Sequence, residues 1–147
     1  MAQVNGFVFD KTTGNVRMYA GDTGSFKVHI SRKNGESWPD TARLLYTVTN
    51  GSGEIVIQRL YRLDDQWDLG DGKFLVEFHN DDTDTWDPGT YTTELRFDVS
   101  PIWDGSPIPT ARCVDALAEG VPKMIEGSIV RTTIQSTLTI SGILGEI

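Results

Sequence analysis

The sequence predicts an all-β fold: an antiparallel β-sandwich of about seven to eight strands with one short helix. Apolar and polar side chains alternate over many short runs, glycine- and asparagine-rich turn signals separate those runs, and only one segment has a helical pattern. Alternation buries one face of a strand, because successive side chains point to opposite faces. The links are too short for the crossover between parallel strands, so we expect antiparallel neighbours. A chain of 147 residues fits a single β-sandwich domain over 1–147.

The first half of the chain contains five predicted strands, at 7–9, 16–19, 26–30, 42–49 and 55–63. In the third, Phe26, Val28 and Ile30 alternate with polar residues, which is typical of a strand with one buried face and one solvent-exposed face. The fourth and fifth are rich in Val, Ile, Leu and Tyr, so we expect them to be more fully covered. Turn signals stand between the strands, among them those at 13–15 and 50–53.

The second half contains three more strands, at 74–78, 91–99 and 129–140, all with clear alternation. Between the last two, three prolines predict a long loop over 100–110. The sequence ARCVDALAE predicts a helix over 111–119, with Gly120 as its stop signal. We therefore expect a proline-rich loop and short helix, inserted near 100–120.

Composition and charge exclude some function classes. The chain has 13 Lys and Arg against 21 Asp and Glu, a formal net charge of −8. Nucleic-acid binding needs clustered basic side chains, which this sequence lacks, so we expect no nucleic-acid partner. No stretch approaches the 18 apolar residues of a membrane span, and the first residues do not resemble a secretory leader. We expect a soluble chain, made in the cytosol, with no membrane partner.

No catalytic, cofactor or metal motif stands out, so we expect no catalytic residues, no cofactor and no metal site. His29 and His79 occupy polar strand positions, and Cys113 is best interpreted as a packing residue. Acidic residues gather in two loops, 64–71 and 81–87, at opposite ends of one strand. Neither loop has the spacing of an EF-hand, although weak calcium binding stays an alternative to turn formation. A hydrolase built on two carboxylates is a further alternative, which no motif favours.

Aromatic and apolar residues outside the strands are candidates for partner contact. All four tryptophans, Trp38 among them, fall in or beside predicted loops, where they could cap the open ends of the sandwich, contact a protein or stack on a sugar. The C-terminal segment 140–147 is apolar and could pair with a neighbouring subunit. The candidate contact residues are Trp67, Trp86, Trp103, Ile143, Leu144 and Ile147.

A short motif sharpens the fold prediction. In immunoglobulin-like sandwiches a tyrosine near the start of the sixth strand donates its hydroxyl group to backbone a few residues upstream, often within Asp-x-Gly-x-Tyr. Asp87, Gly89 and Tyr91 have this spacing and directly precede a strongly alternating strand. They predict a tyrosine corner in an immunoglobulin-like fold. Thr93 stands where the cysteine of the usual inter-sheet disulfide would be, so we expect no such disulfide.

The order of several motifs resembles the immunoglobulin-like N-terminal domain of phage upper baseplate proteins, which prophages also encode. The resemblance covers about 16–99, with a looser similarity at 128–140, and does not include 100–120. Its motifs, in chain order, are YAGDTGSF at 19–26, the Tyr-x-Val strand at 46–48, DGKF at 71–74, DDT at 81–83 and PGTY at 88–91.

The resemblance implies a non-enzymatic virion structural protein that acts in baseplate or tail assembly, or as an adaptor. It implies contacts with other baseplate or tail proteins, a homo-oligomer in the virion, and localisation in the virion after synthesis in the host cytoplasm. The alternative from the residues is a carbohydrate-binding β-sandwich module that uses loop tryptophans, with Trp67 and Trp86 beside acidic side chains.

Overall fold

The computed structural model describes residues 6–30, 38–62, 73–105, 107–118, 124–127 and 130–141. These residues form eleven strands and a single helix of one turn, so the all-β prediction is confirmed. The strands are β1 (Val8–Phe9), β2 (Val16–Tyr19), β3 (Gly24–His29), β4 (Arg43–Thr49), β5 (Ile55–Arg62), β6 (Lys73–Phe78), β7 (Gly89–Asp98), β8 (Pro101–Trp103), β9 (Cys113–Asp115), β10 (Met124–Gly127) and β11 (Val130–Ser141), and the helix is α1 (Asn80–Thr83).

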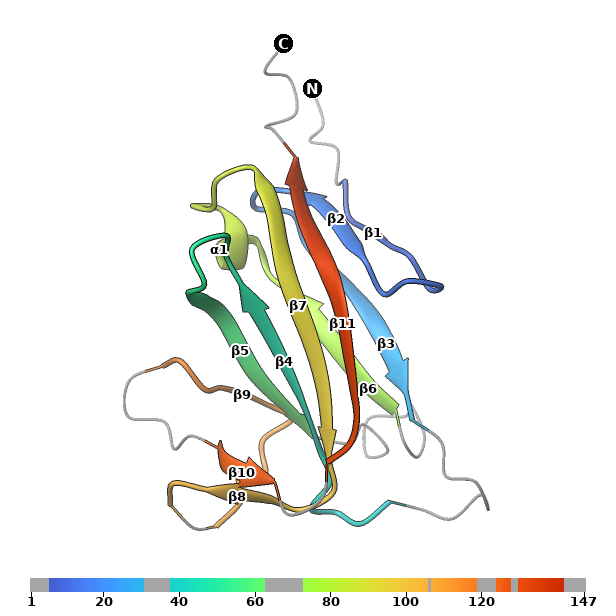
Figure 1. The fold of residues 1–147 in the computed structure, drawn as a ribbon, viewed down its shortest axis with the longest axis vertical. Helices are drawn as coiled ribbons and strands as arrows, with labels where there is room; N and C mark the ends of the chain where they lie inside the picture. Colours follow the sequence, from blue (N-terminus) through green and yellow to red (C-terminus); the bar gives the residue numbers. More distant parts are fainter. Residues whose placement is uncertain are drawn as a thin grey trace.

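Seven of the strands form one large sheet in the order β1-β2-β11-β7-β4-β5-β9 (Figure 1). The strands β3 and β6 pair with each other in a second sheet, and β8 and β10 in a third. Most neighbours are antiparallel, but β2 runs parallel to β11, with Val16 opposite Leu138. The prediction of an entirely antiparallel arrangement is therefore wrong at this pair. Parallel pairing needs a long connection, and here almost the whole chain lies between the two strands.

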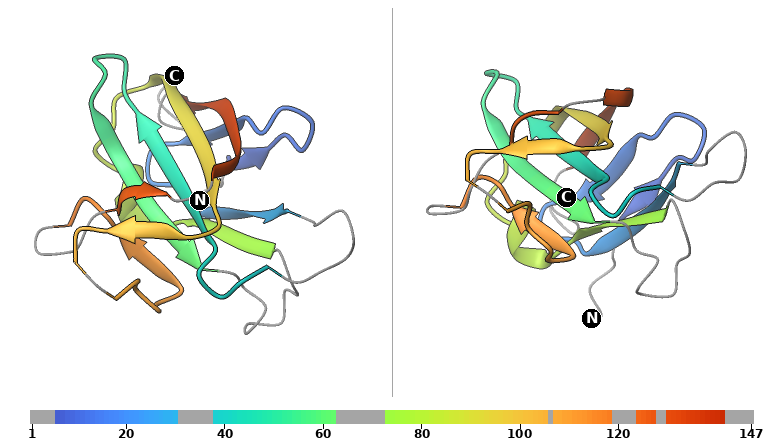
Figure 2. Two further views of the ribbon diagram at one scale, coloured as in Figure 1. Left: turned by 60° about the horizontal axis from the view of Figure 1, so that its bottom comes forward. Right: turned by 90° about the horizontal axis from the view of Figure 1, so that it is seen from below.

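The main hydrophobic core joins the large sheet to the β3–β6 pair, which lies across from it (Figure 2). Tyr46 of β4 packs edge-to-face on Phe78 of β6, with ring centroids 6.0 Å apart. Phe97 of β7 packs in the same way on Phe74 of β6, at 5.7 Å. Apolar residues on one face of each strand therefore meet in a shared interior, as their alternation predicts.

The segment after β7 differs from its prediction. No helix forms over 111–119 in the described residues: β9 pairs with the edge of β5, and a turn follows at 116–118. The helical pattern was too short to prevail over strand pairing, because an isolated helix of two or three turns is marginal. The predicted loop over 100–110 contains β8, which pairs with β10. The only helix in the described residues, α1, lies in the acidic loop where a turn was expected.

Arg43 anchors the proline-rich segment to the large sheet. Its side chain is buried and donates hydrogen bonds to the backbone carbonyl oxygens of Asp40, Ala42 and Pro109, the last at 2.9 Å. Burial lowers the pKa of Arg43 to about 10, so the guanidinium stays charged at neutral pH. Beside it, Trp103 packs on Leu45 and Leu60 in a second, smaller core cluster. The segment is thus fixed on the face of the sheet that points away from the main core.

Candidate functional site

The tyrosine predicted to form a corner lies at the start of β7. The Tyr91 hydroxyl group donates a hydrogen bond to the backbone carbonyl oxygen of Asp87 at 2.8 Å, which is the contact expected of a tyrosine corner. Gly89 has φ 151°, a conformation that side chains disfavour. Trp86 stacks on the Tyr91 ring, with centroids 4.8 Å apart. Burial raises the pKa of Tyr91, so the hydroxyl remains a donor at neutral pH.

The described tryptophans pack within the protein. Trp103 is only 7% exposed, so nearly all of its side chain serves the smaller core cluster and not the partner contact predicted for it. Trp86 and Trp38 are partly buried against the main core. Trp38 also donates a hydrogen bond from Nε1 to the carbonyl oxygen of Ile30 at 2.7 Å. The other predicted contact residues lie outside the described residues: Trp67, Ile143, Leu144 and Ile147.

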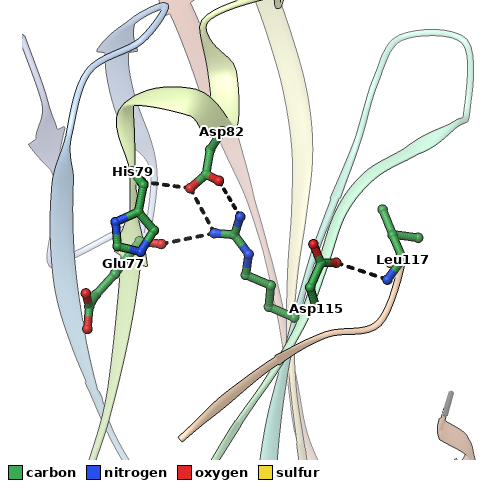
Figure 3. A network of polar contacts seen from close by, with 6 residues as sticks. Glu77, His79, Asp82, Asp115 and Leu117 are labelled. Atoms are coloured by element: carbon green, nitrogen blue, oxygen red, sulfur yellow. Dashed lines mark hydrogen bonds and ion pairs between the residues drawn. The ribbon is translucent and has the colours of Figure 1, made fainter. Parts of the chain in front are cut away.

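A cleft lies between the β5–β9 edge of the large sheet and the β6–α1 segment (Figure 3). Its volume is about 270 Å³. Arg59 of β5 reaches across it and makes a two-pronged ion pair with Asp82 of α1, including Nη1 to Oδ2 at 2.9 Å. Arg59 Nη1 also donates to the backbone carbonyl oxygen of Glu77 at 3.2 Å. The cleft is lined by Arg59, Tyr61, Leu75, Glu77, His79, Arg112, Cys113 and Asp115.

Local sequence explains how these groups meet. Arg59 lies between Ile57 and Tyr61 on the face of β5 that points toward the core, so its guanidinium group needs a partner. Asp82 supplies it from α1, and Asp82 Oδ2 also accepts a hydrogen bond from the backbone N of His79 at 2.7 Å, within a capping box. The side chains of Arg59 and Asp82 are only 14% and 9% exposed.

A second ion pair crosses the cleft near its surface. Arg112, next to β9, lies 3.5 Å from Glu77 of β6, and both side chains are about one-third exposed (36% and 35%). Both arginines thus belong to the β5–β9 edge, and both acidic partners belong to the β6–α1 segment. The two ion pairs together hold the β5–β9 edge against the β6–α1 segment.

Burial and hydrogen bonding shift the pKa values of three groups in the cleft. Burial by itself would raise the pKa of Asp82, but the hydrogen bonds from Arg59 and from the His79 backbone outweigh it and lower the pKa. Burial by itself would lower the pKa of Arg59, and the contacts with Asp82 and Tyr61 reverse this effect and raise it. Cys113 is exposed at the sheet edge, so its interpretation as a packing residue is wrong; desolvation at the cleft wall raises its pKa, and its thiol is protonated at neutral pH. A protonated thiol is a poor nucleophile.

Four charged side chains of the cleft are engaged in ion pairs with one another. General acid–base or nucleophilic catalysis needs a titratable group that is free to react, whereas Asp82 and Arg59 are engaged with each other and Glu77 with Arg112. Within the described ranges, no group of three or more His, Cys, Asp or Glu side chains is placed to hold a metal ion. In the acidic loop, Asp82 supports the helical turn and Asp87 supports the tyrosine corner through its backbone.

The large sheet also carries a hollow on its outer face, which points away from the main core. The volume is about 400 Å³, and strands β4, β5, β7 and β11 all contribute to it. Its lining is mostly uncharged and can form hydrogen bonds. The lining residues are Leu45, Thr47, Thr49, Ile55, Gln58, Thr92, Thr93, Glu94, Arg96 and Gln135.

Sequence reasoning missed both the arginine-centred cleft and the outer hollow. One signal was available for the first: an arginine at a core-facing position of a strand requires a buried acidic partner. That partner is 23 residues away at Asp82, and the sequence contains many acidic candidates. No local signal indicated the second, because the polar phase of the strand at 91–99 contains Glu94, Arg96 and Asp98 and looks like ordinary surface.

Comparison of the chain with protein-family models, with curated proteins and with solved structures finds no match in any of the three. No helix among the described residues is long and apolar enough to cross a membrane.

Proposed function

We propose that this chain is a non-enzymatic structural module of a phage or prophage virion, with an immunoglobulin-like β-sandwich fold. It would act in baseplate or tail assembly, or as an adaptor, and contact other baseplate or tail proteins in several copies. Its place would be the virion, with no nucleic-acid or membrane partner. The order of motifs over 16–99 is the source of this proposal.

The observation that carries the proposal is the hydrogen bond between Tyr91 and Asp87 at the start of β7. In immunoglobulin-like domains this corner begins a strand that lies at the centre of one sheet. Here β7 lies between β11 and β4, while β3 and β6 pair separately across the core. This arrangement supports the immunoglobulin-like fold that the resemblance implies.

The engagement of the polar cleft residues in ion pairs supports a structural role over an enzymatic one. The carbohydrate-binding alternative gains no support from the described tryptophans. Trp86 stacks on Tyr91 and Trp103 is buried, so neither resembles an open platform for a sugar ring.

The test is whether the chain sediments with tailed particles after prophage induction in the strain that encodes it. Particles are purified on a density gradient, and peptides of this chain are quantified by mass spectrometry against known tail proteins. An abundant cytoplasmic protein of the host serves as the control for trapping. We expect a fixed ratio to tail proteins across the particle fractions. If the chain stays with the cytoplasmic control while particles sediment, the proposal is wrong.

A further inference from the structure

The parallel pair of β2 and β11 has a geometry that resists tension along the chain. Its register runs from Val16 opposite Leu138 to Tyr19 opposite Ser141. The N-terminal end of β2 therefore lies at one end of the pair, and the C-terminal end of β11 lies at the other. A pull on these two ends in opposite directions draws the strands past each other along their length.

Strands drawn past each other in this way are loaded in shear. All hydrogen bonds of the pair then carry the force together, whereas strands that are pulled apart sideways lose one residue pair at a time. The sliding distance before rupture is short, because a donor and an acceptor no longer bond beyond about 3.5 Å. A given free energy change over a shorter distance requires a larger force.

Side chains of both strands anchor the pair in the main core. Val16 and Met18 of β2 are 2% and 1% exposed. Leu138 and Ile140 of β11 are 0% and 1% exposed. Sliding the strands moves all four side chains out of their packed positions, which the close packing of a protein interior opposes. On its other side β11 pairs with β7 along most of its length, so the load passes into the centre of the large sheet.

The turn before β2 is also fastened to β11. Asn15 Oδ1 accepts a hydrogen bond from the backbone N of Thr137 at 3.0 Å. The Ser136 hydroxyl group donates a hydrogen bond to the backbone carbonyl oxygen of Thr13 at 2.8 Å. Both bonds lie at the end of the pair where β2 begins. They therefore resist any force that reaches β2 from its N-terminal side.

The same pull loads β1 differently. β1 is antiparallel to β2, and in the described residues the two strands pair through Val8 and Phe9. Before β1, Gly6 N donates a hydrogen bond to the carboxylate of Asp22 at 2.8 Å. β1 therefore begins at the end of the sheet where β11 ends (Figure 1). A pull between these two points lifts β1 from β2 one residue at a time, so β1 detaches at low force and the load then reaches β2.

We propose that the parallel pair of β2 and β11 is a mechanical clamp, through which this chain carries tension between its N-terminal and C-terminal sides. In front of the clamp, β1 is a short segment that extends first. This inference deepens the proposed function, on which it rests for the source of the load, because a structural component of a tail transmits force between its neighbours. The clamp itself follows from the direction and register of the two strands.

Single-molecule stretching of the full chain, held between two marker domains of known unfolding force, tests the clamp. We expect two steps. The first is a lengthening at low force as residues 6–15 come free, about 35 Å of extended chain. The second is a rupture at high force that releases residues 16–141, roughly 440 Å of extended chain.

The direction of pulling gives the main comparison. Thr90 is exposed at the start of β7 and lies opposite Thr139 in the antiparallel pair of β7 and β11. In a Cys113→Ser background, one handle is attached at Thr90→Cys and the other at the C-terminal end of the chain. This pull separates β11 from its neighbours one residue pair at a time. We expect rupture at a force several-fold lower than between the two ends of the chain.

Two sets of substitutions separate the clamp from general stability. Asn15→Ala/Ser136→Ala removes both bonds that fasten the turn to β11, so the force of the second step should fall. Asn50→Ala is the control, since Asn50 Oδ1 accepts hydrogen bonds from the backbone N of Ser52 and of Glu54 in the turn between β4 and β5. It should lower the thermal stability but leave the rupture force unchanged. Forced unfolding reports the rate of unfolding along the pulled direction and not the equilibrium stability.

The proposal is overturned if both pulling directions give the same rupture force. It is also overturned if Asn50→Ala lowers the force between the two ends as much as Asn15→Ala/Ser136→Ala does. If the double variant does not fold, as thermal unfolding will show, the two pulling directions still decide. A single step that frees residues 6–141 together would contradict the separate role of β1.

The proposed function fails separately from the clamp. A chain that sediments with tail particles but ruptures at the same force in both directions retains the function and loses the clamp. A chain that ruptures as expected but is absent from particles retains the clamp and loses the function.

Discussion

The cleft at the β5–β9 edge and the outer face of the large sheet use polar side chains in opposite ways. In the cleft, the charged side chains of Arg59 and Asp82 are nearly buried and paired with each other. On the outer face, threonine and glutamine predominate and the central charges are only Glu94 and Arg96. The cleft therefore pairs charges that are almost buried, whereas the outer face carries mostly uncharged polar groups, among which Gln58 Nε2 donates a hydrogen bond to Thr47 Oγ1 at 3.4 Å.

This difference predicts how much each region contributes to stability. A buried charge that loses its partner destabilises the fold strongly, while exposed strand positions tolerate substitution. We therefore expect changes in the cleft to reduce stability in every setting. Changes on the outer face should leave stability almost unaltered.

The largest effect is expected for Asp82→Ala. It leaves the guanidinium of Arg59 without its ion pair and removes the acceptor for the His79 backbone N–H. We expect the free energy of unfolding to fall by about 3 kcal/mol in urea titrations at neutral pH. Asp81→Ala, which changes an exposed neighbour in the same helical turn, should alter it by less than about 0.5 kcal/mol. Equal effects of the two variants would contradict the structural role of the pair.

The same pair predicts a pH dependence. The folded pKa of Asp82 is lowered, so its stabilising contribution is present above the unfolded value of about 3.9 and is lost as pH falls through the lower, folded value. Urea titrations of wild type and Asp82→Asn should therefore differ by a constant amount near neutral pH. The difference should shrink below about pH 4. A difference that stays constant into strong acid would contradict this assignment.

A smaller effect is expected at the tyrosine corner. Tyr91→Phe removes the hydrogen bond to the Asp87 carbonyl oxygen but keeps the stacked ring. The free energy of unfolding should fall by about 1 kcal/mol, the usual net value of one such bond. Tyr19→Phe, a half-buried tyrosine on β2, serves as the comparison and should change stability less. If the two substitutions cost the same, the corner contributes nothing of its own.

The smallest effect on stability is expected on the outer face. Thr92 is exposed in the middle of β7, so Thr92→Arg should change the free energy of unfolding in urea titrations by less than about 0.5 kcal/mol. A loss of 2 kcal/mol or more would mean that the outer face supports the fold and that the contrast with the cleft is wrong.

Much of the fold follows from local pattern. The alternating runs at 74–78 and 91–99 correspond to β6 and β7, because period-two alternation reports directly on which side chains are buried. The turn signals at 13–15 and 50–53 mark tight turns, with Gly14 and Gly53 at positive φ. These features depend only on residues near one another in the chain.

Features that depend on distant residues were not predicted. The parallel pairing of β2 with β11 joins residues 16 and 138, and no local pattern specifies it. The segment 111–119 has moderate helical propensity, yet Cys113–Asp115 adds to the edge of β5, because backbone pairing at an open sheet edge outweighs a weak local preference.

The cleft was missed for the same reason. Arg59 meets Asp82 only because β5 and α1 lie side by side in the folded chain, and acidic residues are too common in this sequence to identify the partner. Trp103 was expected at the surface on the basis of its place beside a loop. Tertiary packing instead places its side chain against Leu45 and Leu60 of the large sheet, where it is buried.

The central proposal is that this chain is a structural component of a tailed phage particle. The most direct measurement follows the wild-type chain through density-gradient fractions of particles from the encoding strain, with its amount determined by mass spectrometry and an abundant cytoplasmic host protein as the control for trapping. The proposal predicts a constant ratio of this chain to tail proteins across the particle fractions. A chain that stays with the cytoplasmic control while the particles sediment would contradict it.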